Sequence, residues 1–468
     1  DRRWTRLEAL TPAMAGTEVL VRARVHTIRD KGKCVFVMLR QAVSTAQACL
    51  FAGKDVPKAM VKFVGEITQE SLVEVRGKLT VPPAPVESVT QSMVEIQIET
   101  LHVVSRAAIE LPFQLDVASR PLAEGEVDGE AKDDGEESSP DMPTVSQFTR
   151  LNHRWIDLRT PANQAIMRVS SMVCTLFREF LVERDFVEIQ TPKILGGASE
   201  GGSEVFQLSY FGESACMAQS PQLYKQMVAA CSDFERVFEV GPVFRAENSN
   251  THRHLCEFHG LDMEMTFNEH YYEVLDVFSD LFIYMFDGLN ERCKSELEAV
   301  RKQFPFEDLR YHRPTLRITY AEGMKLLQDA GFDVDPMGDL DTPSEKALGK
   351  IVAEKYGTDF FFMDKYPMSV RPFYTMPDAE NPLLSNSYDF FIRGEEILSG
   401  AQRIHVPEML IQQAVAKGIP PESIKPYIDS FRHGALPHGG GGIGLERVVM
   451  LFLGLGNIRR SSMFPRDP

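Results

Sequence analysis

The sequence predicts two folded parts, a small β-barrel followed by a larger α+β domain around a mostly antiparallel sheet. Three observations predict this organisation. Residues 17–106 form short runs with the period-two alternation of strands, and residues 142–468 mix amphipathic helices with strand pairs. A strongly acidic stretch at 123–141 separates them. The chain of 468 residues is long enough for two to four domains of roughly 100–200 residues each.

The first part is predicted to be a barrel over residues 1–119. Apolar and other residues alternate at 19–25, 35–39 and 94–98, with Gly and Pro between such runs. About five strands in so short a segment are typical of a small barrel such as an OB-fold. The alternation places Phe36 on the outside. There it either packs under a loop or presents a ring on which nucleic-acid bases can stack.

The acidic stretch is predicted to be a hinge or insertion, bounded by residues 120–146. Residues 123–141 hold nine acids and one lysine, a net charge of −8, with too few apolar residues to form a core. The whole chain carries −17, which by itself argues against a nucleic-acid partner. Residues 1–119, however, carry +2, so the charge is unevenly distributed.

Cysteine usage and hydropathy indicate a cytoplasmic protein. The seven cysteines are widely spaced and include no CxxC pair, which favours free thiols in a reducing compartment and disfavours a zinc site. No apolar run reaches the ~18 residues of a membrane span.

The second part, residues 147–468, shows its elements in order. Helical spacing of apolar residues predicts a long helix at 164–181, and a short strand follows at 186–194. Two strands are predicted at 236–247 and 255–267, with a polar loop between them. Near the end of the chain, residues 389–406 predict a hairpin turning at Arg393-Gly394, and a glycine run then leads into an apolar helix at 439–455.

Several side chains in this part are suited to binding phosphate and a metal ion. Arg245 ends a strand and Arg447 lies in the first turn of a helix after glycines, and arginine makes bidentate contacts to phosphate. Glu396 and Ser399 could supply oxygen ligands to Mg²⁺. Residues three apart lie on opposite faces of a regular strand, so co-ligation requires a kink or a bulge, expected near Gly400.

A second group is suited to a small carboxylate. Lys225 and Arg403 could clamp it, with Asp262 as their counter-charge. Taken alone, each of these residues is more often part of a surface ion pair than of a binding site.

Two other motifs do not support their usual function. The sequence GGGGIGLER lacks the GK[ST] of a P-loop and is not surrounded by a βαβ unit. The loop histidines lack a cysteine pair or a third ligand at zinc-finger spacing, so no zinc is expected. We expect them to contact substrate or solvent: His252, His254, His259, His433 and His438.

Taken together, the motifs resemble those of the eukaryotic-type cytosolic aspartyl-tRNA synthetases, a class II family of subclass IIb. Three class II signatures occur in order: the helix and strand with Pro192, the segment FRAEN…HRH…EF at 244–258, and GIGLER at 442–447. They are accompanied by SEGG (199–202), QSPQLYKQ (219–226), GLDMEM (260–265) and SGAQR (399–403). The resemblance covers nearly the whole chain and implies an OB-fold anticodon-binding domain before a class II catalytic domain.

The resemblance implies a role for each matching residue. Arg245 is expected to contact the α-phosphate of ATP, Glu247 the adjoining nucleotide or tRNA end, and Glu396 and Ser399 the Mg²⁺. The remaining ATP-binding positions are Arg253 and Arg447 at the γ-phosphate, Phe258 on adenine, Glu257 near its edge, His254 and Gly444.

For aspartate, the resemblance implies that Lys225 and Arg403 clamp the side chain while Asp262 orients the arginine. Ser199, Glu200 and Gln222 are expected around the ammonium and backbone. Pro192 is expected at a homodimer interface. In the barrel, Phe36, Gln47 and Glu95 match the anticodon-reading positions, which favours the stacking interpretation of Phe36.

Lys225 argues for aspartate as the amino acid that is attached to tRNA(Asp). An asparagine-specific relative would leave this cation unpaired beside a neutral amide, and a lysine-specific relative would need acids there. Two alternatives remain: an asparagine-forming or asparagine-activating relative, and a catalytically silent synthetase-like binding protein. An exchange assay with each amino acid separates them.

Overall fold

The computed structural model describes residues 2–54, 56–121, 144–196 and 205–468. These residues fall into two compact units, one comprising the chain up to Arg120 together with the segment ending at Gln164, the other beginning at Ala165. Residues 147–164, predicted as the start of the second domain, therefore group with the first unit. The acidic stretch 123–141 lies outside the described residues, so its role as a hinge or insertion stays a prediction.

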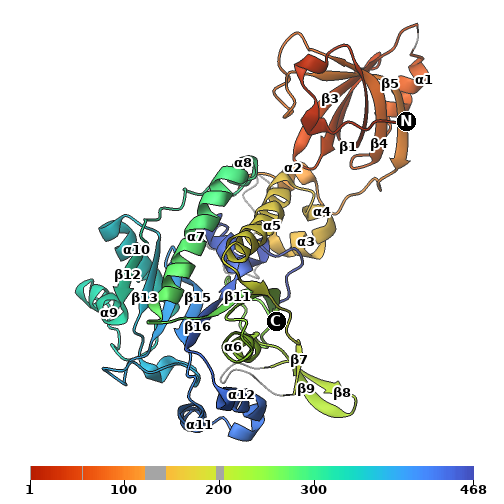
Figure 1. The fold of residues 1–468 in the computed structure, drawn as a ribbon. Coiled ribbons are helices and arrows are strands. Elements are labelled where there is room, and N and C mark those ends of the chain that lie inside the picture. Colours follow the sequence, from red (N-terminus) through yellow and green to blue (C-terminus); the bar gives the residue numbers. More distant parts are fainter. Residues whose placement is uncertain (1, 55, 122–143, 197–204) are drawn as a thin grey trace. The chain divides into compact units, whose positions relative to one another are not determined.

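The first unit is built on a closed five-stranded barrel in the order β1-β2-β3-β5-β4, as predicted (Figure 1). Its strands are β1 (Glu18–Asp30), β2 (Cys34–Gln41), β3 (Ser44–Phe51), β4 (Leu72–Thr80) and β5 (Glu95–Ser105). Val35, Val37 and Leu39 are fully buried, so the period-two pattern does mark the barrel core. The helices of this unit are α1 (Lys58–Gly65), α2 (Leu115–Ala118), α3 (Gln147–Asn152) and α4 (Arg154–Asp157).

The second unit is built on an eight-stranded sheet in the order β12-β13-β14-β15-β16-β11-β10-β6. The pairs β12–β13 and β10–β6 are parallel and the other five are antiparallel, which confirms the predicted sheet type. The strands are β6 (Val187–Glu188), β10 (Arg236–Phe244), β11 (Glu257–Thr266), β12 (Leu316–Thr319), β13 (Phe360–Asp364), β14 (Ser387–Ile392), β15 (Glu395–Gln402) and β16 (His438–Gly444).

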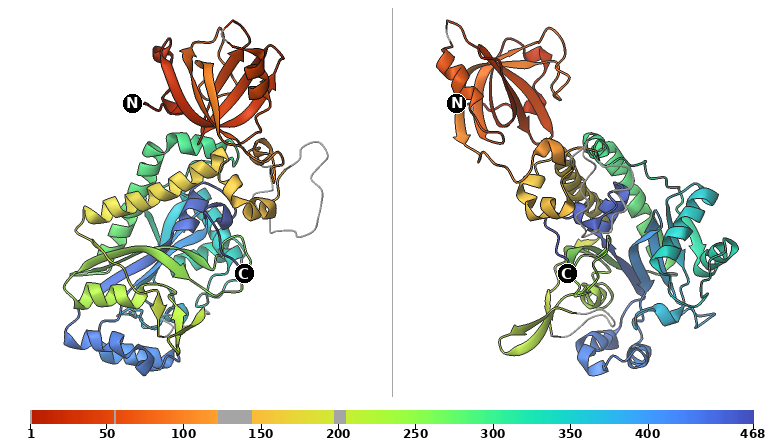
Figure 2. Two further views of the ribbon diagram at one scale, coloured as in Figure 1. Left: turned by 90° about the vertical axis from the view of Figure 1, so that its right-hand side faces the viewer. Right: turned by 180° about the vertical axis from the view of Figure 1, so that it is seen from behind.

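Two long helices pack side by side against this sheet (Figure 2). They are α5 (Pro161–Val182) and α7 (Tyr272–Arg292). Phe177 of α5 packs edge-on against Phe238 of β10, and Phe282 of α7 lies 5.5 Å from Phe390 of β14 between ring centroids. The other helices are α6 (Gln222–Cys231), α8 (Lys294–Arg301), α9 (Tyr320–Asp329), α10 (Thr342–Tyr356), α11 (Pro407–Ala416), α12 (Lys425–Ser430) and α13 (Leu445–Phe452).

A separate three-stranded sheet, β7-β9-β8, projects from this unit (Figure 1). Its strands are β7 (Ile194–Leu195), β8 (Gln207–Tyr210) and β9 (Glu213–Met217). All seven cysteines are free thiols. Among the described residues, no helix has the length and apolarity needed to cross a lipid bilayer.

Candidate active site

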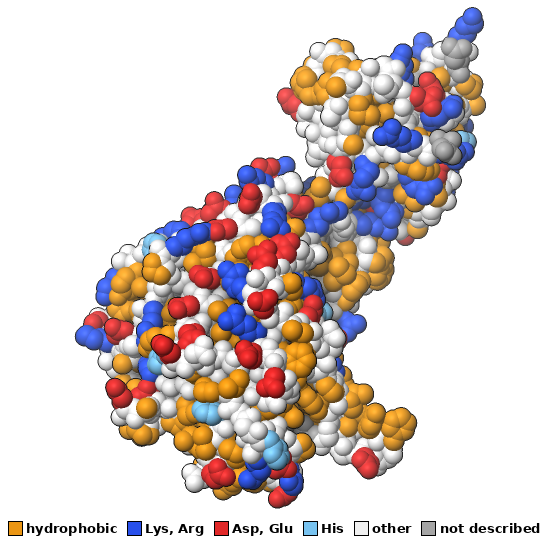
Figure 3. Space-filling model, in the orientation of Figure 1, with side chains coloured by type: hydrophobic (Ala, Val, Ile, Leu, Met, Phe, Trp, Pro, Cys, Tyr) orange, Lys and Arg blue, Asp and Glu red, His pale blue; other side chains and the backbone are white. Residues whose placement is uncertain are grey.

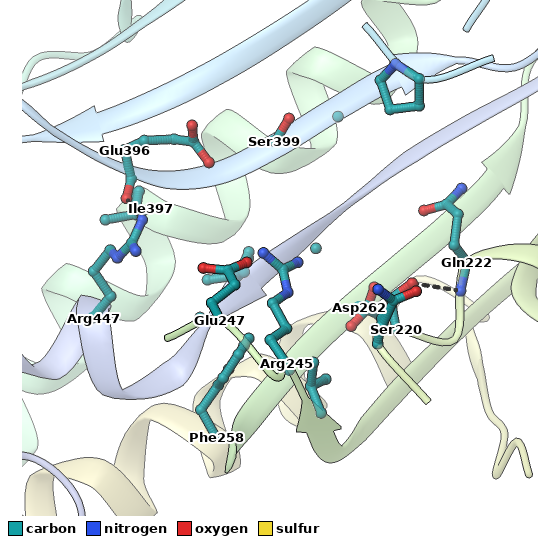
Figure 4. Close-up of a pocket in the computed structure, with 18 of the residues that line it drawn as sticks. Ser220, Gln222, Arg245, Glu247, Phe258, Asp262, Glu396, Ile397, Ser399 and Arg447 are labelled. Carbon is teal, nitrogen blue, oxygen red and sulfur yellow. Dashed lines mark hydrogen bonds between the residues drawn. The ribbon is translucent and has the colours of Figure 1, made fainter. Parts of the chain in front are cut away.

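A cavity of about 410 Å³ lies within the second unit. Its walls come from β10, β11, β15, β16, the start of α13 and the loop around 370–375. Figure 4 shows acidic, basic and aromatic side chains from these elements around one space. The cavity brings together twelve predicted site residues: Gln222, Arg245, Glu247, Arg253, His254, Phe258, Asp262, Glu396, Ser399, Arg403, Gly444 and Arg447.

Two arginines that line the cavity, Arg245 and Arg447, make hydrogen bonds with backbone carbonyl oxygens. The backbone N–H of Arg245 donates to Cys256 at 2.9 Å, and its guanidinium carbon lies 5.6 Å from the ring centre of Phe258. Arg447 donates from Nη1 to the carbonyl oxygen of Glu396 at 2.9 Å and from Nη2 to that of Arg253 at 3.3 Å. Since both acceptors of Arg447 are neutral carbonyls, the positive charge of this guanidinium is suited to an anionic ligand such as a polyphosphate.

His254 lies beside these arginines. Burial lowers the pKa of its imidazole, and the charges of Arg447 and Arg253 lower it further. Thr251 Oγ1 lies 2.5 Å from Nδ1, which fixes the ring. A neutral histidine here can donate or accept a hydrogen bond without adding charge.

The bulge required for Glu396 and Ser399 to share a face is present. Phe390 pairs with Leu398, but the next residue, Phe391, pairs with Glu396, so Ile397 is the extra residue. The prediction of a bulge is confirmed, although it lies at Ile397 and not near Gly400. It turns both side chains toward the cavity (Figure 4).

Asp389 completes a carboxylate pair with Glu396. It lies opposite Ser399 across the β14–β15 ladder and receives hydrogen bonds from both terminal nitrogens of Arg371, at 3.1 and 2.7 Å. Arg371 also donates to Ser399 Oγ at 3.1 Å. Burial and, after it, the charge of Asp389 raise the pKa of the Glu396 carboxyl to about 7. A divalent cation would relieve this repulsion.

Two carboxylates and a hydroxyl oxygen fit Mg²⁺, which commonly uses one or two protein carboxylates together with substrate phosphates and water. Within the part of the chain that the structure describes, no group of three or more His, Cys, Asp and Glu residues could enclose a metal. The site therefore fits a metal shared with a phosphate ligand better than a closed protein cage.

Lys225 and Arg403 form a second, buried charge cluster. Lys225 Nζ donates to Asp262 Oδ1 at 2.9 Å and to the carbonyl oxygen of Gly441 at 3.0 Å. Arg403 donates to the two oxygens of Glu264 at 3.0 and 3.3 Å. In these contacts Glu264 pairs with Arg403 and Asp262 pairs with Lys225, so Glu264 also orients the arginine, and the orienting role of Asp262 stays a prediction. Arg403 lines the cavity, and Lys225 lies behind the lining, 1% exposed.

The glycine run is a strand, β16, where the sequence had indicated only a glycine stretch before a helix. It lies between β11 and β15, and Gly440 and Gly442 pair with Glu264 and Asp262. A Cβ at Gly440 would overlap the Met263 carbonyl and the Glu264 carboxylate. Glycine is therefore needed for these carboxylates to fit beneath the strand.

The structure does not bring every predicted residue into the cavity. Ser199 and Glu200 lie outside the described residues. Glu257, exposed at the start of β11, and Pro192, also exposed, do not line it. His438 corrects an expectation, because it is fully buried in β16 and its Nε2 lies 3.3 Å from Gln226 Oε1.

The barrel residues Phe36, Gln47 and Glu95 share the outer face of the first unit. Each is half-buried, and each alternates with core residues. Gln47 and Glu95 are paired in register across β3 and β5 and joined by a hydrogen bond. The ring of Phe36 packs edge-on against Phe51, 5.8 Å away. The three side chains thus form a polar and aromatic surface.

Sequence reasoning missed Asp389, Arg371 and Glu264. A signal existed for two of them. Glu264 lies two residues after Asp262, on the same strand face, and Asp389 could be located by counting back from the predicted hairpin turn. Arg371 comes from an irregular loop for which no pattern gives a direction.

Known families match both parts of the chain. The family described as tRNA synthetases class II (D, K and N) matches residues 146–468, and the OB-fold nucleic acid binding domain matches residues 19–104. The cytoplasmic aspartate–tRNA ligases of Mus musculus and Homo sapiens are each 55% identical over 468 residues, covering 100% of this chain and 91% of theirs.

Solved structures of tRNA synthetases also resemble the whole chain. An aspartyl-tRNA synthetase from Entamoeba histolytica superposes with a TM-score of 0.90 at 47% identity, covering 100% of this chain and 92% of that one. An asparaginyl-tRNA synthetase from Pyrococcus horikoshii, complexed with asparaginyl-adenylate, superposes with a TM-score of 0.83 at 28% identity, covering 100% and 98%.

Proposed function

The chain belongs to the class II tRNA synthetases of the D, K and N group and is an aspartate–tRNA ligase, and from this premise we propose which residues carry out its reaction. In the first step the α-carboxylate of aspartate attacks the α-phosphorus of ATP, and pyrophosphate leaves. In the second step the terminal 3′-hydroxyl of tRNA(Asp) attacks the acyl carbon of aspartyl-adenylate, and AMP leaves. Because no covalent enzyme intermediate forms, binding geometry and charge supply most of the catalysis.

The observation that carries the assignment is the convergence of three arginines on one cavity. Arg245 contacts the α-phosphate, where negative charge develops in the transition state, and Arg253 and Arg447 hold the γ-phosphate. Phe258, close to the Arg245 guanidinium, stacks on adenine. The further nucleotide contacts in the cavity are Glu247, His254 and Gly444. Glu257, outside the lining but next to Phe258 in sequence, is the proposed contact at the adenine edge.

The amino-acid subsite lies at Arg403. Its guanidinium is oriented by Glu264 and by the carbonyl oxygen of Gly440, and it binds the side-chain carboxylate of aspartate through the donors that remain on Nη1. Lys225 adds a second positive charge from beneath, and Gln222 with Ser199 and Glu200 surrounds the ammonium and backbone. A neutral asparagine side chain does not match these charges, so the subsite favours aspartate.

Glu396 and Ser399, together with Asp389, would hold Mg²⁺. When bound, the ion would neutralise phosphate charge during displacement of pyrophosphate. Arg371 keeps Asp389 and Ser399 in place through the bonds described above.

The chain acts as a homodimer with Pro192 at the interface. Several large exposed apolar side chains occur within the short stretch from Val182 to Phe211, and Phe211 is 93% exposed. Figure 3 shows hydrophobic side chains covering the projecting β8–β9 hairpin. A surface of this kind is typical of an interface. Sedimentation equilibrium measures the state directly, and a monomer at micromolar concentration would contradict it.

The barrel, predicted over 1–119, reads the anticodon through Phe36, Gln47 and Glu95. A ring and two hydrogen-bonding groups on one face are what recognition of unstacked bases requires. The cytoplasm is the site of action, in line with the names of the relatives.

Arg245→Ala tests the proposal. We expect it to abolish aspartate-dependent ATP–pyrophosphate exchange while thermal unfolding stays near that of the unaltered chain. Arg310→Ala is the matched control, since Arg310 pairs with Asp359 outside the cavity. Near-normal exchange in Arg245→Ala would refute the role of Arg245.

A further inference from the structure

Arg253 is held by a residue that does not line the cavity. Its Nη1 donates to Glu345 Oε2 at 2.8 Å. Arg253 lines the cavity, while Glu345 lies behind it in the first turn of α10. A guanidinium has five N–H donors in a fixed plane, so a carboxylate on one side orients the remaining donors.

The backbone of the loop that carries Arg253 is held by other groups. Ile458 N donates to the carbonyl oxygen of His252 at 2.8 Å, and Arg459 Nη1 donates to that of Thr251 at 3.0 Å. Arg447 donates to the carbonyl oxygen of Arg253 itself. These contacts fix the backbone of the loop, whereas the Arg253 side chain is oriented by its hydrogen bond to Glu345.

Glu345 is itself rigidly placed. Asp341 caps α10 by accepting from Ser344 N at 2.9 Å. One turn beyond Glu345, Gly349 packs directly on the Gly394 backbone, where any Cβ would overlap it. Gly394 lies in the turn that begins β15, the strand of Glu396 and Ser399. Helix α10 thus connects Arg253 to the strand that carries the proposed metal ligands.

We propose that Glu345 is a positioning residue for ATP, which aims the Arg253 guanidinium at the terminal phosphates. This inference rests on the role proposed above for Arg253. The carboxylate does not touch the nucleotide; it fixes the rotamer of a flexible side chain before the nucleotide binds, so less conformational entropy is lost on binding.

The surroundings of Glu345 support a role that depends on Arg253. The residue is 8% exposed, and burial raises the pKa of its carboxyl, while the charges of Arg253 and Arg447 lower it. Its sequence neighbour Lys346 is directed elsewhere, with Nζ 3.8 Å from Glu395 Oε1. Lys346 therefore provides a control on the same helix.

The experiment is ATP–pyrophosphate exchange by the full chain, with KM measured separately for ATP and for aspartate. We expect Glu345→Gln to raise KM for ATP about tenfold, as loss of one charged hydrogen-bond partner implies, with KM for aspartate within about twofold of the unaltered chain. Lys346→Met should leave both constants near their original values. Arg253→Ala should raise KM for ATP at least as much as Glu345→Gln.

The double variant separates positioning from a general structural role. If Glu345 acts through Arg253, adding Glu345→Gln to Arg253→Ala should change KM for ATP by less than about twofold. Multiplied effects, or an unchanged KM in Glu345→Gln, would overturn the inference and leave the proposed function standing. An unchanged KM in Arg253→Ala would instead refute the proposed role of Arg253, and this inference with it. If Glu345→Gln fails to fold, Glu345→Asp retains the charge, and it should raise KM for ATP by a smaller factor without affecting KM for aspartate.

Discussion

Lys225→Met is the substitution that most sharply tests recognition of aspartate. Lys225 is 1% exposed, 2.9 Å from Asp262 Oδ1 and 3.6 Å from Glu264 Oε2. Methionine fills a similar volume but removes the charge. Two unit charges about 4 Å apart interact by about 4 kcal/mol at an effective dielectric constant of about 20. We therefore expect kcat/KM for aspartate to fall by about 10²–10³-fold, with KM for ATP little changed.

The same substitution lowers stability, because it removes the buried Lys225–Asp262 ion pair, at a cost of up to about 3–5 kcal/mol. Arg317→Met is the matched control, since it removes a cation from the buried carboxylate of Asp364 away from the cavity. The assay is exchange with aspartate and with asparagine, below the unfolding temperature of both variants. An unchanged KM for aspartate in Lys225→Met, or an equal loss in Arg317→Met, would refute the reasoning.

Three further predictions concern the barrel, the buried histidine and the glycine strand. Phe36→Ala should raise KM for tRNA about tenfold and leave exchange unchanged, because one stacked base contributes about 1–3 kcal/mol; equal charging kinetics would contradict it. Burial lowers the pKa of His438 to about 4, so the folded chain holds its imidazole neutral. Because the unfolded chain takes up this proton below pH ~6.5, the free energy of unfolding falls by up to about 3 kcal/mol as the pH drops from ~6.5 toward 4. His438→Asn should remove that dependence in chemical unfolding measured at several pH values, and an unaltered pH profile would count against it. Gly440→Ala should lower the free energy of unfolding by about 2–3 kcal/mol, because the added Cβ overlaps the Met263 carbonyl and the Glu264 carboxylate. Gly53→Ala should not, since a Cβ there meets nothing within 4 Å. Equal melting curves for the two variants would disprove the close approach of β11 to Gly440.

Local patterns in the sequence predicted the elements whose cause is local. The Arg393-Gly394 turn is predictable because a two-residue hairpin turn favours glycine, which adopts positive φ without strain. Both residues have positive φ in the structure. Barrel strands were found because one face of each is buried. The bulge was inferred from the chemistry of Glu396 and Ser399, but its position at Ile397 depends on pairing with β14, which spacing alone does not specify.

The parts that were missed depend on contacts between distant segments. Arg253 and Glu345 are 92 residues apart in sequence, and Arg403 and Glu264 are 139 apart. A pattern in one segment cannot say which carboxylate meets which cation. The glycine run was not predicted as a strand, because glycine disfavours strands unless backbone or side chains must approach closely, and here the carboxylates of β11 require it.

The central claim is that this cavity activates aspartate and rejects asparagine. The most direct measurement is ATP–pyrophosphate exchange by the unaltered chain with each amino acid in turn, followed by charging of a tRNA with a GUC anticodon. We predict exchange with aspartate at least about 10²-fold more efficient than with asparagine, and aspartate attached to that tRNA. Comparable exchange with asparagine, or none with aspartate, would contradict the account.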